Sequence, residues 1–245
     1  MLIAAGAALE TLSHGADMGW CTPLVQAAFQ NKEEVLFVLL RAGANPHVMG
    51  SAGSSALMTA AEHGRSAMVD ALLAAGARQT IHVAALLGDL GEVDRWLTKS
   101  PAWLEAKDPY RQAPPLYYAA YADRIEVVRV LLARGADPDA PDNHPWTPLF
   151  TAARSGRSDV VIALADHDAD VNFVSATARW RLPAGTSVLH AACRAAGTTP
   201  EAIETLMRRG ADPRIEDAEG QRPLDVAKAN ARDDLVLCLM SGASR

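Results

Sequence analysis

The chain has 245 residues and a formal net charge of −6, and 49% of its residues are hydrophobic but only 5% aromatic. This acidic balance argues against sequence-independent binding of nucleic acid, because the phosphate backbone requires an excess of Lys and Arg. No run of about 18 apolar residues is present, so we expect no membrane-spanning helix. The three cysteines are far apart and form no C-x-x-C motif, which favours a reduced, cytoplasmic location.

A segment of the form L-x-x-A-A, or a close relative of it, recurs seven times along the chain. Its copies begin, in chain order, at Leu24, Leu57, Ile81, Leu116, Leu149, Leu189 and Leu224. Successive copies are 33, 24, 35, 33, 40 and 35 residues apart, and each is followed by a second apolar segment. A period near 33 residues predicts a stack of helix pairs in which each pair contacts its neighbours.

The residues around each copy have the properties that a helix pair requires. Thr22 and Thr147 can cap a helix, because a threonine hydroxyl accepts a backbone N–H at the helix start, and the proline that follows each of them fits the first turn. The Ala-Ala pair lets neighbouring helices approach closely. Gly43 and Gly135 follow the second apolar segment, where glycine permits the left-handed turn that ends a helix.

Three segments carry the most specific motif: Thr22-Pro23-Leu24, Thr147-Pro148-Leu149 and Arg222-Pro223-Leu224. Together with endings such as Arg134-Gly135-Ala136-Asp137, they resemble the ankyrin repeat family. The resemblance implies an all-α solenoid whose unit is a turn, a helix, a second antiparallel helix and a hairpin loop. This loop is called a finger below, and each finger is counted with the repeat that follows it. It also implies a role in binding other proteins. We expect a single domain over residues 1–245, with about seven repeats that start near residues 22, 55, 79, 114, 147, 187 and 222.

Several parts of the chain depart from this pattern. Residues 2–7 (LIAAGA) read as the end of a second helix without its first helix, so we expect residues 1–18 to form a partial N-terminal half repeat. The third repeat lacks a finger, and its second helix should end at residues 99–101 (KSP). Long loops follow at residues 101–113 and 172–186, where function is often placed. Asp168 stands at the usual glycine position, and Asp tolerates left-handed geometry.

No sequence motif for catalysis, phosphate binding or zinc binding is present, so we expect a non-enzymatic protein without cofactor or metal. His190 and His82 occupy the position where the resemblance implies a structural bridge between turns. Cys193 stands at the second alanine position and is interpreted as a small core residue. An acidic run near Asp168 lacks the glycine and the final glutamate of a calcium loop.

The resemblance also indicates which positions face a partner: the finger tips and the residues just after Ala-Ala. Repeats four to six combine Tyr, Trp and Arg at these positions, the residue types that dominate interface hot spots. The candidate binding residues are Tyr110, Arg111, Tyr118, Tyr121, His144, Trp146, Arg154, Trp180, Arg181 and Arg194. We expect Tyr121 and Trp146 to be apolar anchors, and Arg111, Arg154 and Arg181 to pair with acidic groups of a partner protein or peptide.

Two alternatives remain open from the sequence. The same groove could hold a small molecule or a catalytic site under a lid formed by residues 172–185, with His144 or Tyr121 as acid or base and Arg154 as an anion clamp. That alternative requires a deep, enclosed pocket. The chain could instead self-associate through its N-terminal face. The favoured hypothesis is a monomeric module that binds a protein through the groove of repeats four to six, with no nucleic acid or membrane as partner.

Overall fold

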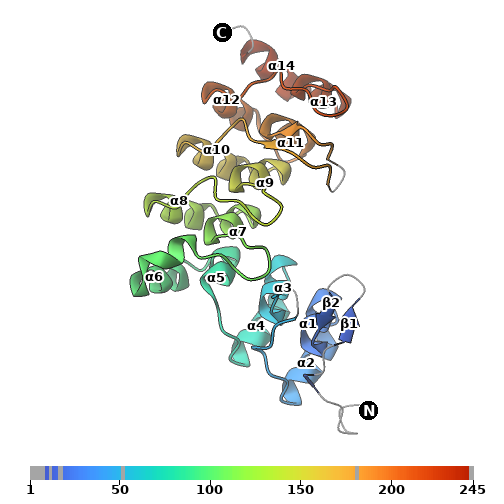
Figure 1. Cartoon of the computed structure of the whole chain (residues 1–245), viewed down its shortest axis with the longest axis vertical. Coiled ribbons are helices and arrows are strands. Elements are labelled where there is room, and N and C mark those ends of the chain that lie inside the picture. The colour runs from blue at the N-terminus through green and yellow to red at the C-terminus, as the bar shows by residue number, and fades with distance from the viewer. Residues whose placement is uncertain (1–8, 11–12, 16–18, 51–52, 180–181, 243–245) are drawn as a thin grey trace.

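The computed structural model describes residues 9–10, 13–15, 19–50, 53–179 and 182–242. Its helices form antiparallel pairs that stack into an elongated array, with α1 and α2 near one end and α13 and α14 at the other (Figure 1). The first helices are α1 (Pro23–Phe29), α3 (Ala56–Glu62), α5 (Ile81–Leu87), α7 (Pro115–Tyr121), α9 (Pro148–Arg154), α11 (Val188–Arg194) and α13 (Pro223–Ala229). The second helices are α2 (Glu33–Arg41), α4 (Ser66–Ala74), α6 (Leu90–Lys99), α8 (Ile125–Ala133), α10 (Ser158–Asp166), α12 (Pro200–Arg208) and α14 (Asp233–Gly242).

The first helices begin where the sequence supplies a side-chain cap. The Thr22 hydroxyl accepts the backbone N–H of Val25, and the Thr147 hydroxyl accepts that of Phe150 at 3.2 Å. The helix α7 lacks such a cap, because Pro114 precedes it, and Pro115 occupies its first turn instead. Side-chain caps, or a proline in the first turn, therefore fix where these helices start, and neighbouring repeats stay in phase.

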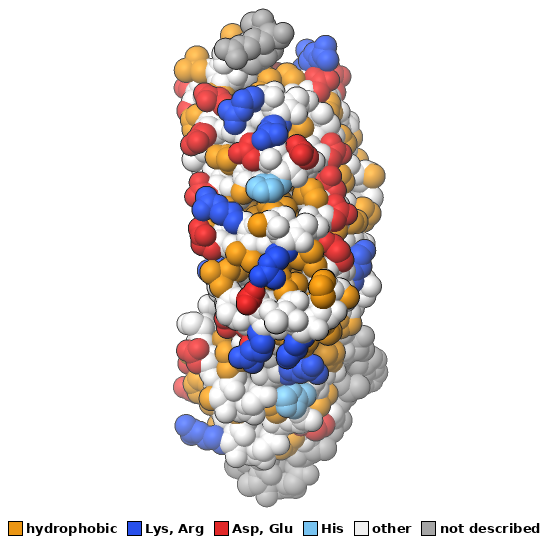
Figure 2. All heavy atoms as spheres, turned by 90° about the vertical axis from the view of Figure 1, so that its left-hand side faces the viewer, with side chains coloured by type: hydrophobic (Ala, Val, Ile, Leu, Met, Phe, Trp, Pro, Cys, Tyr) orange, Lys and Arg blue, Asp and Glu red, His pale blue; other side chains and the backbone are white. Residues whose placement is uncertain are grey.

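The core runs continuously along the array. The first helices pack on one another through their buried Ala-Ala pairs, as between α7 and α9. The second helices cover the first ones, and α8, α10 and α12 contact each other in sequence. The outer face of the second helices carries acidic and basic side chains close together (Figure 2), including an ion pair between Arg134 and Asp94 at 2.6 Å.

The fingers contain what little β-structure the described residues have. Strands β1 (Ser13–Gly15) and β2 (Gly19–Cys21) pair antiparallel before α1, and β3 (Val174–Ser175) and β4 (Thr186–Ser187) pair antiparallel before α11. The loop before α7 begins with a short 3₁₀-helix, η2 (Pro101–Glu105).

The third repeat has no finger, since only residues 75–80 separate α4 from α5. The fingers of the second and fourth repeats meet across this position. A Cβ added at Gly53 would lie 2.9 Å from Cβ of Pro109, so the two backbones are in direct contact there. The missing finger thus brings the second and fourth repeats close together.

These observations confirm the predicted helical solenoid of about seven repeats. The helix α6 ends at Lys99, as expected, and Asp168 has a left-handed φ of 61°. The expected helix end at residues 2–7 lies outside the described residues. None of the described helices is long and apolar enough to span a bilayer.

Candidate functional site

Two adjoining cavities lie along the C-terminal ends of the first helices of repeats two to five. The smaller has a volume of about 200 Å³ and is lined by Arg111, Tyr117, Tyr121 and Arg154. The larger, of about 430 Å³, shares Tyr121 and Arg154 with it. The other residues that line the larger cavity are Ala61, Glu62, Gly64, Leu86, Ala122, Arg124, Ser155 and Arg157. We call the two cavities together the arginine groove.

A buried aspartate shapes the finger that carries Arg111. Asp108 Oδ2 accepts the backbone N–H of Tyr110 at 2.7 Å and that of Arg111 at 3.0 Å. Its Oδ1 accepts the N–H of Ala113 at 3.0 Å. One carboxylate therefore closes the whole finger, as aspartates do in tight turns, and it fixes the direction in which Arg111 leaves the backbone.

The Arg111 side chain crosses to the second repeat. Its Nε donates to Oε1 of Glu62 at 2.9 Å. Its guanidinium carbon lies 5.2 Å from the Tyr110 ring centroid and 5.9 Å from that of Tyr121, within cation–π range. Burial opposes the charged form of Arg111, but the Glu62 carboxylate outweighs it and raises the pKa of Arg111 above its usual value. Arg111 is therefore a fixed cation at one side of the groove.

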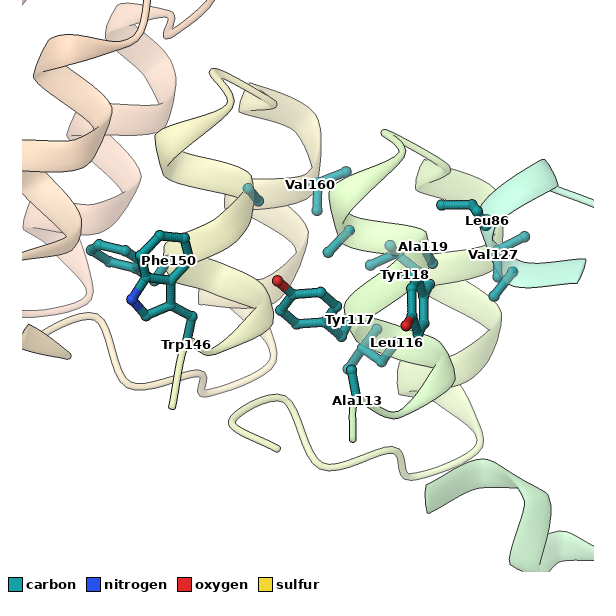
Figure 3. Packing of buried hydrophobic residues seen from close by; sticks show 14 of the residues in the cluster. Leu86, Ala113, Leu116, Tyr117, Tyr118, Ala119, Val127, Trp146, Phe150 and Val160 are labelled. Atoms are coloured by element: carbon teal, nitrogen blue, oxygen red, sulfur yellow. The ribbon is translucent and has the colours of Figure 1, made fainter. Parts of the chain in front are cut away.

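Arg154 ends α9 and lies over an indole ring. Its guanidinium carbon is 5.0 Å from the Trp146 ring centroid. The Trp146 ring is held by a bond from its Nε1 to Ser175 Oγ at 3.3 Å and by Phe150 at a centroid distance of 5.3 Å (Figure 3). Burial, together with the nearby charge of Arg111, lowers the pKa of Arg154. The groove therefore holds a second cation whose position depends on a buried aromatic side chain.

Two predicted contact residues are corrected by their burial. Trp146 is 1% exposed and Tyr118 is fully buried, so neither offers a surface to a partner. Trp146 instead lies against the guanidinium group of Arg154. Tyr118 packs edge-on against His82 at a centroid distance of 5.9 Å, and burial and the Asp108 carboxylate raise its pKa. The sequence positions were finger tip and helix turn, but both side chains point into the core.

Tyr117 links the groove to the next finger. Its hydroxyl donates to Oδ2 of Asp142 at 3.0 Å, and burial and this carboxylate raise the pKa of Tyr117. Asp142 Oδ1 also accepts the backbone N–H groups of His144 and Trp146. Figure 3 shows Tyr117 pointing towards the repeat that carries Trp146 and Phe150, with Tyr118 on the other side of α7. The neutral hydroxyl forms part of the groove wall.

Three charged residues of the groove are not among the candidate binding residues predicted from the sequence: Glu62, Arg124 and Arg157. Glu62 is the partner of Arg111. Arg124 and Arg157 each stand directly before a second helix, at equivalent positions of adjacent repeats. Each stands at the same distance after the Ala-Ala pair of its repeat, so their equivalence was visible in the sequence.

The remaining candidates lie away from the groove or cannot be placed. His144 Nδ1 is 3.4 Å from Oδ2 of Asp142. Arg194 pairs with the buried Asp217 at 3.3 Å in the next repeat, and it lines neither cavity. Trp180 and Arg181 lie outside the described residues. The structure therefore brings together Tyr110, Arg111, Tyr121 and Arg154, and it leaves His144 and Arg194 apart from them.

The two bridging histidines have the structural role expected of them. His190 Nδ1 accepts from Ser187, and its Nε2 lies 2.8 Å from the carbonyl oxygen of Gln221. His82 Nε2 lies 2.6 Å from the carbonyl oxygen of Ala106. Each ring links two consecutive repeats as a neutral side chain. Cys193 is buried, and burial raises its pKa to about 12, as a core thiol requires.

The loop expected to act as a lid does not reach the groove in the described part of the chain. Neither cavity is lined by a described residue of 172–185 or by His144. Of the residues assigned to a catalytic alternative, Tyr121 and Arg154 lie in the groove, but the acid or base His144 does not. The arrangement brings cations and a tyrosine together, which suits recognition of an anionic group better than proton transfer.

A family model described as ankyrin repeats (3 copies) matches residues 1–81 and again residues 81–175. The chain belongs to the ankyrin repeat family. Three relatives illustrate its range. The E3 ubiquitin-protein ligase XB3 of Oryza sativa subsp. japonica is 35% identical over 167 residues, which cover 66% of this chain and 37% of that protein. The putative E3 ubiquitin-protein ligase XBAT31 of Arabidopsis thaliana is 31% identical over 163 residues, 64% of this chain and 35% of that protein.

The human B-cell lymphoma 3 protein is 30% identical over 219 residues, which cover 88% of this chain and 41% of that protein. The chain thus spans well under half the length of the curated relatives it matches. What it shares with them is an ankyrin repeat region, a type of module that typically binds other proteins. The arginine groove is the part of this ankyrin repeat region where charged and aromatic side chains converge.

Proposed function

We propose that this ankyrin repeat region binds a partner protein through the arginine groove and recognises an acidic segment of that partner. The observation that carries the proposal is that Arg111 and Arg154 line one cavity together with Tyr121, and that each arginine lies against an aromatic ring. Both cations belong to a chain with a net charge of −6. A local excess of positive charge on an acidic protein favours a partner that presents carboxylate or phosphate groups.

The rings and the ion pair reduce the entropy that binding must overcome. An arginine side chain that is free to move loses about 0.5–1.5 kcal/mol when an interface immobilises it. Arg111 is already held by Glu62, and Arg154 is already restricted by Trp146. Tyr121 is half-buried between them and offers a ring face and a hydroxyl. We expect the truncation of any one of these three residues to weaken a complex by about 2 kcal/mol.

The relatives support a binding role for the region rather than a reaction carried out by it. Two are named as ubiquitin ligases, but their match to this chain covers only 37% and 35% of their length. The B-cell lymphoma 3 protein matches nearly the whole of this chain without that name. The shared part is the repeat array, so we assign recognition of a protein partner to the array.

Affinity capture from a lysate of the source organism tests the proposal. The wild type is compared with Tyr121→Ser/Arg154→Gln and with a matched control, Arg95→Gln/Arg129→Gln, whose arginines are well exposed on the outer helices. We expect a partner that wild type and control retain, that the groove variant loses, and whose binding weakens as salt is raised. Equal retention by all three proteins would contradict the proposal.

A further inference from the structure

The larger cavity of the groove has a surplus of positive charge. Arg124, Arg154 and Arg157 line it, and Glu62 is the only acidic residue among the described lining residues. Glu62 is already paired with Arg111, which lies just outside this cavity. Three arginines and one carboxylate therefore line the cavity, and that carboxylate is already paired with a fourth arginine.

Arg124 is anchored through its Nε atom, and its two Nη atoms point to no acceptor among the described residues. Its Nε donates to the carbonyl oxygen of Leu86 at 3.0 Å, and its side-chain stem packs against Gly88, where an added Cβ would lie 3.0 Å from Cδ. A guanidinium fixed in this way presents two donors to a ligand in a constant geometry.

Arg157 is also incompletely used. Its Nε–H is buried and has no acceptor among the described residues. Its Nη1 lies 3.5 Å from Asp123, and these side chains are 42% and 45% exposed, so this pair is weak and screened by solvent. A buried donor without an acceptor is costly unless a ligand or ordered water satisfies it.

The ends of α7 and α9 compete little for these cations, whereas at the end of α5 the carbonyl oxygen of Leu86 accepts from Arg124. The backbone N–H of Ala122 bonds to the carbonyl groups of Tyr118 and Ala120 at the end of α7. The N–H of Ser155 bonds to those of Thr151, Ala152 and Ala153 at the end of α9. The carbonyl groups that would otherwise attract an arginine therefore already have donors.

We propose that Arg124, Arg154 and Arg157 form a subsite for a phosphoryl group carried by a side chain of the partner protein. This inference rests on the proposed function and specifies its ligand. A phosphoryl group brings a charge of about −1.5 to −2 and three acceptor oxygens, which match three guanidinium groups better than the single charge of a carboxylate. The volume of about 430 Å³ accommodates the group and part of its side chain, and Ser155 adds a hydroxyl at the wall.

Titration with phenyl phosphate, followed by NMR of the backbone and arginine Nε–H signals, tests the subsite directly. Acetate at equal ionic strength is the reference ligand. We expect phenyl phosphate to bind wild type and the exposed control Arg129→Gln equally, and to bind Arg124→Gln and Arg154→Gln at least about tenfold more weakly. Arg154→Lys keeps the charge without the fork and should be intermediate. Binding that is absent, equally strong in all variants or matched by acetate would overturn the subsite.

Dephosphorylation separates this inference from the proposed function. A lysate is treated with alkaline phosphatase before capture, and the partner retained by the wild type is quantified. We expect treatment to abolish retention, as Arg124→Gln should. The partner could instead be retained after phosphatase treatment and by Arg124→Gln, but not by Tyr121→Ser/Arg154→Gln. That result would overturn the phosphoryl subsite and leave the proposed binding groove in place. A partner that the wild type and Tyr121→Ser/Arg154→Gln retain equally would contradict both the subsite and the proposed function.

Discussion

The Nε atom of Arg111 lies 2.9 Å from Oε1 of Glu62, and this ion pair joins the finger of the fourth repeat to the first helix of the second. The two residues are 49 positions apart and can meet because the third repeat, between them, has no finger. The short connection at residues 75–80 therefore makes this contact across the arginine groove possible.

Breaking this pair should destabilise the array. The side chains of Arg111 and Glu62 are only 18% and 6% exposed, so Glu62→Gln leaves a largely buried cation without its partner. We expect the free energy of unfolding in urea to fall by about 2 kcal/mol. The exposed pair of Glu126 and Arg129 serves as the control. Glu126→Gln should change the free energy of unfolding by less than about 0.5 kcal/mol.

A double-mutant cycle isolates the pair itself. Glu62→Gln, Arg111→Gln and the double variant should show a coupling energy above about 1 kcal/mol, because neither residue substitutes for the other. Strictly additive losses would mean that the ion pair does not hold the fourth finger against the second repeat.

The helix pairs were predictable from the sequence because their signals are local. Thr22 and Thr147 cap the helices that follow them, and His190 forms the expected bridge between turns. The groove was only partly predictable. Glu62 meets Arg111 through a contact between distant repeats, which no local pattern encodes. Trp146 is buried because its ring packs on Phe150 and bonds to Ser175 of the next finger, so its tip position did not imply exposure.

The turn between α9 and α10 should be intolerant of a side chain. A Cβ at Gly156 would lie 2.9 Å from the Cα of Gly197, whereas the equivalent Gly64 has nothing within 4 Å. Both glycines have left-handed φ values, 68° and 64°, so the backbone strain of an alanine is matched. We expect Gly156→Ala to be more destabilising than Gly64→Ala by about 1–3 kcal/mol, measured by thermal or urea unfolding. Equal losses of stability in the two variants would show that the turn at Gly156 does not contact Gly197.

Stability should fall between neutral and mildly acidic pH. Burial lowers the pKa of His82 and of His190 from 6.5. Below about pH 6.5 the unfolded chain therefore binds more protons at these two histidines than the folded protein does. The unfolding free energy should therefore decrease as pH falls from 6.5 through the lowered values and be flat near pH 7.5. The double variant His82→Gln/His190→Gln should be less stable at pH 7.5 and should have a shallower pH dependence. An unchanged slope would exclude these histidines as its source.

Stability and binding should separate at Arg154 and Trp146. Trp146→Leu removes a buried ring and should cost about 3 kcal/mol of unfolding free energy. Arg154→Gln alters a partly buried side chain that lies on the core and not in it, and should cost less than about 1 kcal/mol. Both should weaken partner binding, because Trp146 positions Arg154. A folded Trp146→Leu protein with full affinity would show that the indole does not position the arginine.

Hydrogen exchange of the complex tests the central claim most directly. The wild-type protein is compared with and without the partner it retains from lysate, and exchange is measured peptide by peptide. Binding in the arginine groove should slow exchange at residues 118–124 and 151–157, where α7 and α9 end, and leave α8 and α10 unchanged. Protection confined to the outer helices, or to repeats without groove residues, would contradict the account.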